Sequence, residues 1–253
     1  MIFDVQKASM WKRISAYLFD FILLGIVVVG FAFVLSLVTG YDGYGDRFAT
    51  IQEEYENEYG VTFEITQDDY NALSDEQRNK YDEAFKALSN DNEASYVYSM
   101  MVNLTLVITS ISILFAYLLL EFVVPLLFKN GQTLGKKIFG IALMRTDGVK
   151  ITPFALFVRT VLGKYTIETM VPVLIVIMIY FSILGLTGTV VLGLIALLQI
   201  ILLAATKSRS AIHDLLACTV AVDFASQRIF DSSEELLEYK KKLHEERAAS
   251  RER

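Results

Sequence analysis

Four long apolar runs, separated by polar segments, dominate the pattern of the chain. The first run covers residues 14–38 and contains a single charged residue, an aspartate. About 20 apolar residues cross the ~30 Å hydrocarbon core of a bilayer, so this run is long enough to span it. Further runs occupy 101–128, 167–184 and 190–205. The pattern predicts four transmembrane helices, the first of which is too long for a cleaved signal peptide.

We therefore expect an all-α integral membrane protein with a small cytoplasmic hairpin and strand and a helical insert outside the membrane. The expected segments are a tail with the first span (1–40), an acidic helical insert (41–99), the second span (100–128), a basic loop with a hairpin and an interfacial helix (129–166), the third and fourth spans (167–206), an interfacial helix with a strand (207–224) and a charged C-terminal helix (225–253). The short GLTGT joint predicts antiparallel third and fourth spans, and Gly185, Gly188 and Gly193 allow close packing.

The insert at 41–99 is strongly acidic. It carries fifteen acidic residues against four basic ones, a net charge of −11. Two helices are expected within it, with Thr66 and Ser74 as their N-caps. An apolar stripe at helical spacing consists of Tyr81, Phe85 and Leu88. A helical cap on the outer surface and an acidic vestibule that gathers cations both fit this segment, and the second interpretation rests on net charge alone.

The loop that follows the second span is basic and contains a turn signal. Residues 129–164 hold seven Lys and Arg residues, and Asp147 is the only acid. The dipeptide Asp147-Gly148 lies between two strand-like stretches, which predicts a hairpin. A strand expected at 219–224 could pair with this hairpin.

An amphipathic helix is expected after the hairpin, with Thr152 as its N-cap. It is expected to lie in the membrane interface, with Arg159 and Lys164 reaching lipid headgroups. A pairing of Arg159 with an acid inside the membrane is the alternative. Glu168 stands near the expected start of the third span and is placed at the interface, whereas Gln199 in the fourth span is expected to hydrogen-bond across helices.

Basic residues also set the expected orientation in the membrane. Lys7, Lys12 and Arg13 precede the first span, and the basic loop follows the second. Cytoplasmic segments carry an excess of Lys and Arg, so both termini are expected in the cytoplasm and residues 41–99 outside it. The expected location is the cell membrane.

Composition narrows the chemistry that the chain can perform. The residues outside 41–99 are only mildly basic, so no nucleic-acid partner is expected. The single Cys218 excludes an internal disulfide, and His213 and His244 are too few and too far apart for a zinc site. We find no catalytic motif, so neither enzymatic activity nor a cofactor is expected, and the lipid bilayer is the first partner.

Two ionisable residues mark the first span. Arg13 and Asp20 are seven residues apart, two helical turns, so they lie on one stripe of the helix. Ala16 is on nearly the same stripe and would let a neighbouring helix approach closely. A charged Asp costs about 2.5–3.5 kcal/mol at a helix centre on insertion scales, so Asp20 is expected to face protein or water.

A polar face also runs along the second span. It consists of Asn103, Ser110, Tyr117 and Glu121. Pro125 lacks the N–H that would bond the carbonyl of Glu121, which predicts a kink and a free carbonyl. Because Asp20 and Glu121 are expected at one depth, they could share a proton or bind a cation together with Arg13. A polar helix contact with a paired or protonated acid is the alternative.

Three stretches in this order resemble the RDD family of membrane proteins, which is named for one arginine and two aspartates. WKRISAYLFD resembles the opening motif, with Arg13, Ala16 and Asp20. GQTLGKKIFGIALMRTDG and FVRT resemble the central loop, with Gly131, Thr133, Gly135, Lys136 and Arg159, and AIHDLLACTVAV resembles the closing segment, with Asp214. The resemblance implies a bacterial inner-membrane protein involved in the transport of unidentified ligands, over residues 7–224. The insert at 41–99 is longer than the family's outer loop.

Two hypotheses of function follow. Arg13, Asp20, Glu121 and Asp214 could carry a cation, a proton or a small solute, and a transporter with only four spans would be expected to form homo-oligomers. Alternatively, the same residues form a structural polar lock in a scaffold or interaction protein, in which case losing one member costs ~3–5 kcal/mol. An enzyme that uses Asp20 and Glu121 is the weakest interpretation.

Overall fold

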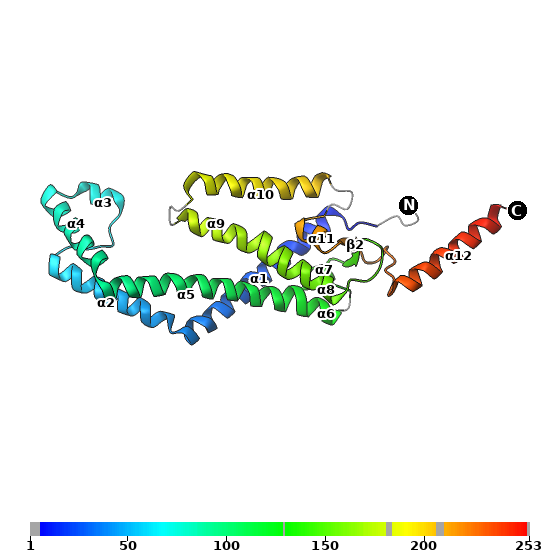
Figure 1. The fold of residues 1–253 in the computed structure, drawn as a ribbon, viewed down its shortest axis with the longest axis horizontal. Helices are drawn as coiled ribbons and strands as arrows, with labels where there is room; N and C mark the ends of the chain where they lie inside the picture. Colours follow the sequence, from blue (N-terminus) through cyan, green and yellow to red (C-terminus); the bar gives the residue numbers. More distant parts are fainter. Residues whose placement is uncertain (1–5, 129, 181–183, 206–209, 252–253) are drawn as a thin grey trace. The chain divides into compact units, whose positions relative to one another are not determined.

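The computed structural model describes residues 6–128, 130–180, 184–205 and 210–251, and within them the chain is mostly helical (Figure 1). Among the described residues, four helices are long and apolar enough to cross a membrane: Met10–Thr39, Asn92–Phe128, Pro153–Ile179 and Gly185–Leu202. The predicted number of spans is confirmed. The chain divides into two compact units, one formed by Val29–Ser112 and the other by Met1–Val28 together with Ile113–Arg253.

The unit Val29–Ser112 contains the insert. It comprises the second half of α1 (Met10–Thr39), α2 (Tyr41–Tyr59), α3 (Gln67–Ala72), α4 (Asp75–Asn90) and the first part of α5 (Asn92–Tyr117). Thr66 and Ser74 cap α3 and α4 as predicted, each in a capping box that satisfies free N–H groups at the helix start. The helix α2 was not predicted, and α5 begins at Asn92, before the expected start of the second span.

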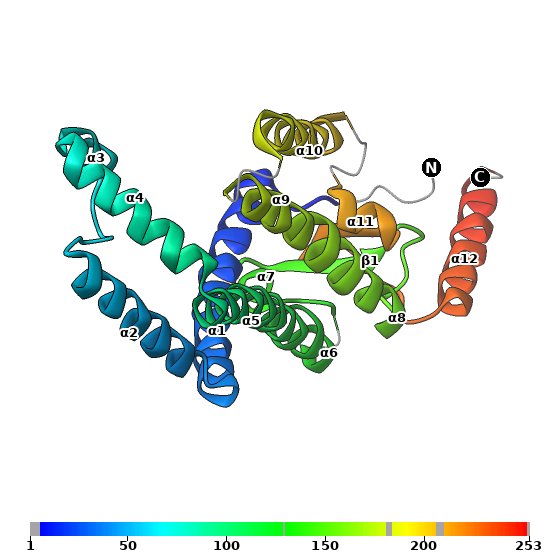
Figure 2. The same cartoon turned by 60° about the vertical axis from the view of Figure 1, so that its left-hand side comes forward.

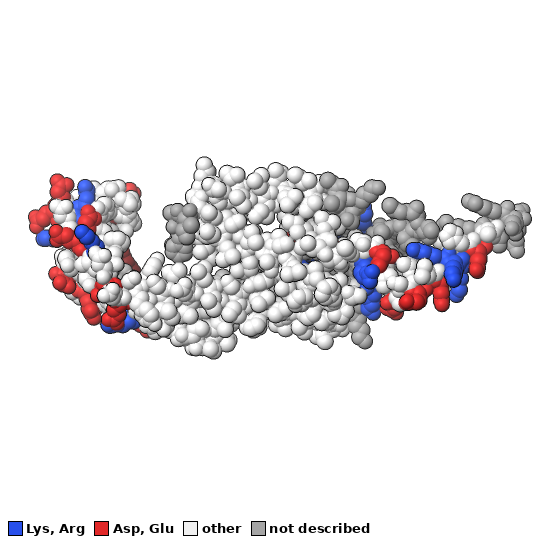
Figure 3. Space-filling model, viewed as in Figure 1, with Lys and Arg blue, Asp and Glu red and all other residues white. Residues whose placement is uncertain are grey.

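Apolar side chains hold this unit together. Ile51, Leu88, Ala94 and Val97 are buried, and they pack with Tyr44, Phe48, Tyr55, Phe63 and Met101. In the predicted stripe Leu88 is buried, whereas Phe85 is 55% exposed. Acidic side chains cover the outside of α2, α3 and α4 (Figure 3). The insert is thus a small helical domain with its own core, and its charges lie on its surface.

The second unit contains the remaining membrane helices. Helix α5 continues into a π-helical turn, η1 (Leu118–Val123), and then into α6 (Val124–Phe128). Helix α8 (Pro153–Phe157), the π-helical segment η2 (Val158–Met170) and α9 (Val171–Tyr180) follow one another without a break, and α10 (Gly185–Ala205) packs beside α9. The view in Figure 3 shows no charged side chain over α9 and α10, as expected for lipid-facing helices.

The continuity of α8, η2 and α9 corrects one prediction. The expected interfacial helix and the expected third span are a single helix that begins at Pro153, so its first turns belong to the span. Thr152 caps it as predicted. Of the three glycines expected to allow helix packing, Gly188 does so, because a Cβ there would lie 2.7 Å from Ile179, whereas Gly193 has open space around it.

A two-stranded antiparallel sheet lies next to the membrane helices. Strand β1 (Ile141–Arg145) pairs with β2 (Thr219–Asp223), which confirms the strand predicted near 219–224. The Asp147-Gly148 turn forms, but the second arm of the predicted hairpin is reduced to one bridge between Met144 and Lys150. Strand β1 packs against α7 (Leu134–Ile138), which lies beside it in Figure 2, and β2 packs against α11 (Ile212–Leu216). The C-terminal helix α12 (Ser233–Arg251) forms as predicted.

Candidate functional site

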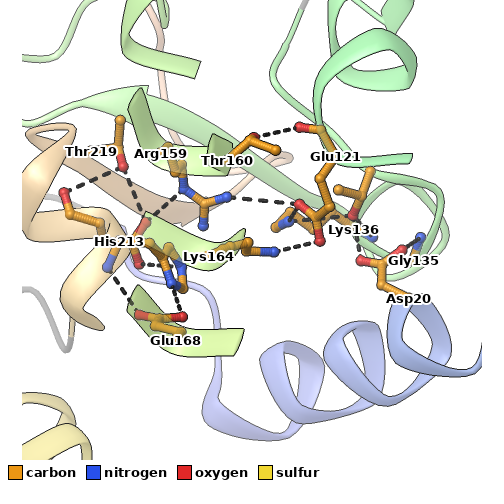
Figure 4. A network of polar contacts seen from close by, with 12 residues as sticks. Asp20, Glu121, Gly135, Lys136, Arg159, Thr160, Lys164, Glu168, His213 and Thr219 are labelled. Atoms are coloured by element: carbon orange, nitrogen blue, oxygen red, sulfur yellow. Dashed lines mark hydrogen bonds and ion pairs between the residues drawn. The ribbon is translucent and has the colours of Figure 1, made fainter. Parts of the chain in front are cut away.

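A cavity of about 420 Å³ lies among α1, η1, α7, η2 and α11, within the unit formed by Met1–Val28 and Ile113–Arg253. Four acids and four bases line it: Asp20, Glu121, Glu168 and Asp214, and Arg13, Lys136, Arg159 and Lys164. Apolar side chains such as Ile14 and Ile141 complete the wall. Figure 4 shows that most of these polar groups form one connected network. The charges balance, which lowers the cost of placing them at a membrane.

Asp214 is the acid at one end of this network. Its Oδ1 atom accepts hydrogen bonds from Arg159 Nε at 3.0 Å and from Thr219 Oγ1 at 3.1 Å, and Arg13 lies 3.9 Å from Oδ2. Burial raises the pKa of the Asp214 carboxyl, but the charge and hydrogen bond of Arg159 together with the nearby His213 and Arg13 outweigh burial, so the net pKa lies well below its usual range. Asp214 is therefore held ionised between two arginines, and Arg13 has its acid partner on α11.

Glu121 occupies the centre of the network and is 6% exposed. Lys164 donates a hydrogen bond to Oε1, while Lys136 Nζ and Arg159 lie 3.8 Å and 4.0 Å from Oε2. The Oε2 atom accepts no hydrogen bond from the described residues. Arg13, Asp20 and Glu121 all line the cavity, and Arg13 pairs there with Asp214. Three other bases surround Glu121.

Pro125 acts on the backbone of Glu121 as predicted. Pro125 has no backbone N–H to donate to this carbonyl, and the π-helical turn η1 lies just before the proline. The carbonyl of Glu121 accepts a hydrogen bond from the hydroxyl of Thr160 at 2.9 Å. A side chain on η2 thus satisfies the carbonyl that Pro125 leaves free.

Asp20 accepts hydrogen bonds from the start of α7, and within the described part of the chain it forms no ion pair. Its Oδ1 accepts the backbone N–H of Gly135 at 2.7 Å, and its Oδ2 accepts the hydroxyl of Thr133. Thr133 is also the N-cap of α7. A Cβ at Gly135 would lie 2.4 Å from the carbonyl oxygen of Ala16, so the glycine is required for this contact. The predicted close approach of a neighbouring helix at Ala16 is found, and the helix that approaches is α7 of the central loop.

Two further residues of the central loop support this region. Gly131 has a positive φ of 63°, and a Cβ there would lie 2.8 Å from Ile151. Lys136 is buried and its Nζ lies 3.3 Å from Thr133 Oγ1, so it connects the surroundings of Asp20 with those of Glu121. Burial lowers the pKa of Lys136 to about 8, although the nearby Glu121 opposes this shift.

His213 and Glu168 join the network at the other side of the cavity. The backbone N–H of His213 donates to Glu168 Oε1 at 3.0 Å, and His213 Nδ1 lies 2.7 Å from Oε2. A Cβ at Gly163 would lie 2.5 Å from the His213 side chain, so this glycine lets α11 pack on η2. The predicted cross-helix hydrogen bond of Gln199 also forms, to Glu168.

The structure corrects the interfacial placement of three residues. Arg159 and Lys164 are 2% and 8% exposed and pair with acids, so they do not reach headgroups, and Glu168 faces the cavity. The alternative prediction for Arg159, a pairing with an acid, is the arrangement found. Spacings of five and four residues put these side chains on one face of a π-helix, which a search for 3.6-residue periodicity misses. Gly163, next to Lys164, was the other feature of the sequence that could have indicated a packed, buried position for this helix.

Within the described residues, no group of His, Cys, Asp and Glu could hold a metal ion. Four apolar helices around a charge-balanced polar cavity define an integral membrane protein with an ionisable core. The family model described as "RDD family" matches residues 7–218, and the chain belongs to this family. Searches of curated proteins and of solved structures find no match.

Proposed function

We propose that the cavity is the site at which a proton or a small cation is exchanged during transport, with Asp20 as the exchanging carboxylate. The observation that supports this role is the difference among the four acids. Glu121 and Asp214 each pair with Lys or Arg, whereas Glu168 is hydrogen-bonded to His213, whose pKa is lowered by burial. Among the described residues Asp20 has no ion-pair partner, and neutral donors hold it. A carboxylate without a fixed counter-charge can take up a proton or a cation at lower cost.

The orientation proposed for this exchange follows the positive-inside rule. Basic residues concentrate in the N-terminal tail and in the loop that carries α7, so both are assigned to the cytoplasm together with the C-terminal helix. The cavity then opens near the cytoplasmic face of the cell membrane, and the insert at 41–99 lies outside. Because four spans are few for one pathway, a homo-oligomer is the expected transporting form. The proposal requires neither a cofactor nor a catalysed reaction.

Flux into proteoliposomes tests this function. Wild type and Asp20→Asn are reconstituted after a check of monodispersity, and a pH dye reports the response to Na⁺, K⁺ and Li⁺ pulses. Asparagine keeps the acceptor for Gly135 N–H, so the variant is expected to fold and to lose flux. Asp147→Asn is the matched control, since Asp147 is an exposed turn residue paired with Arg145. Absence of flux in the wild type would contradict the proposed transport function.

A structural polar lock is the second candidate function. It is favoured by Asp214 and Glu121, whose carboxylates are paired with buried bases, and by the packing of Gly135 against α1. In a membrane scaffold these contacts would fix the loop elements on the spans. If Asp20→Asn loses monodispersity and the wild type moves no ion, this function is supported, and the insert at 41–99 is the first surface on which to seek a partner.

A further inference from the structure

A second, smaller pocket adjoins the cavity. Its volume is about 80 Å³, which is enough for more than one water molecule. Tyr17, Asp20, Glu121, Lys164, Glu168 and His213 line both spaces. The smaller pocket is therefore continuous with the charged cavity through their shared walls, and the acids and bases of that wall supply the polar partners that a buried water needs.

The additional walls of the smaller pocket lie further along the membrane helices. Leu24 follows Asp20 by four residues on α1, and Tyr117 precedes Glu121 by four residues on the second span. Thr169 lies five residues after Lys164 on η2. Helices α1 and η2 run away from the basic loop, whereas the second span runs toward it. Leu24, Tyr117 and Thr169 therefore all lie on the same side of the charged residues, about one helical turn deeper into the membrane.

A hydroxyl pair lies at this deeper end. Tyr117 Oη and Thr169 Oγ1 are 2.9 Å apart, and the ring of Tyr117 also packs edge-on against Tyr165 at 6.3 Å. Resting on the function proposed above, we propose that the smaller pocket is a water-filled extension of the cavity through which the exchanged proton or cation passes. The hydrogen bond between Tyr117 and Thr169 closes the deeper end of this pocket.

Cysteine accessibility tests the water-filled pocket without requiring flux. Cys218 is replaced first, by glycine, because its φ of 51° lies in the left-handed region that glycine adopts readily. Leu24→Cys then lines the pocket, whereas Ile22→Cys on the same helix is 62% exposed on the apolar outer surface. A charged, water-soluble methanethiosulfonate is expected to label Leu24→Cys in liposomes about tenfold faster or more, since only a hydrated thiolate reacts.

A second pair of cysteine variants, on the second span, repeats the test in case one of the α1 variants misfolds. Leu120→Cys lines the pocket and Leu119→Cys is 41% exposed on the outer surface, so the same difference in labelling is expected there. Equal, slow labelling of both pocket positions would overturn the proposal. Since labelling needs no transport, a labelled pocket in a chain that moves no ion would reject the transport function alone.

Passive proton leak tests the closing hydrogen bond. Tyr117→Phe and Thr169→Val each remove one hydroxyl and are expected to raise proton leak about fivefold, the factor that one lost hydrogen bond allows. Thr166→Val is the control, because the hydroxyl of Thr166 bonds to the carbonyl of Val161 on its own helix. Unchanged leak in both variants, or an equal rise in the control, would overturn the assignment of Tyr117 and Thr169 as the closure.

Discussion

Gly135 and Ala16 approach so closely that a methyl group on the glycine would lie 2.4 Å from the carbonyl oxygen of the alanine. Real Cβ atoms do not come this close to backbone atoms, so α7 could not sit on α1 with any larger residue at 135. The contact also brings the Gly135 N–H to within 2.7 Å of Asp20. One glycine thus determines both the packing of α7 and the environment of Asp20.

Gly135→Ala is expected to destabilise the protein by about 1–3 kcal/mol, because overpacking forces the two backbones apart. Thermal unfolding in detergent measures this loss. Gly193→Ala is the control, since that helical glycine has open space around it and alanine favours helices. Equal stability of the two variants would contradict the packing argument.

The buried pair of Arg159 and Asp214 is expected to be strongly coupled. Removing either partner alone, with Arg159→Met or Asp214→Asn, should cost about 3–5 kcal/mol, because it leaves a buried charge uncompensated. The double variant should cost less than the sum of the two, by about 0.5–3 kcal/mol. Unfolding of the four proteins in detergent gives this cycle.

The exposed pair of Arg145 and Asp147 provides the comparison for that cycle. Their side chains are 39% and 43% exposed, so removing this pair should change stability by about 0–1 kcal/mol. Additive effects of Arg159→Met and Asp214→Asn would show that the two side chains do not stabilise each other.

Thr160→Val is expected to destabilise the protein by about 1–3 kcal/mol, since the buried carbonyl of Glu121 then loses its donor. Pro125→Ala restores an N–H that can bond to this carbonyl. The cost of Thr160→Val should therefore be smaller in the Pro125→Ala background, as measured by unfolding in detergent. The same cost in both backgrounds would mean that the hydroxyl does not compensate for the proline.

Acidification is expected to destabilise the protein through His213. Burial, followed by the charge of Arg159, lowers its pKa below 6.5, although Asp214 and Glu168 oppose the shift. Below pH 6.5 the unfolded chain therefore takes up a proton that folded His213 does not, so this stability is present at neutral pH and lost on acidification.

Melting temperatures at pH 7.5 and pH 5.5 measure this effect. The decrease should be smaller in His213→Asn than in the wild type, because the variant lacks the titrating ring. His244→Asn, which changes an exposed residue of α12, should behave like the wild type. A larger decrease in His213→Asn would reverse the sign of the argument.

Much of the fold could be predicted from hydrophobic pattern and local signals. The four apolar runs match the four membrane helices, because a long apolar segment has few other stable places. Thr66, Ser74 and Thr152 predicted helix starts, since capping depends on neighbouring residues only. The effect of Pro125 on the Glu121 carbonyl was predictable for the same reason, since it follows from a missing N–H.

The partners in the site could not be predicted in the same way. Arg159 and Lys164 were assigned to headgroups because a basic amphipathic stretch commonly lies in the interface. Their acids come from other segments, Asp214 from α11 and Glu121 from η1, and no local pattern shows which charges meet. The role of Glu168 was missed because the helix continues through 153–180, and the tight contact of Gly163 with His213 depends on tertiary packing.

The pairing of Arg13 with Asp214 has a consequence for how the protein is made. Arg13 is synthesised at the start of the first span, whereas Asp214, with which it pairs, is synthesised about 200 residues later. We expect nascent chains that stop before Asp214 to be recognised and degraded, which pulse-chase labelling of truncated chains would reveal. The contact between the first helix and α11 can therefore form only after translation has passed Asp214.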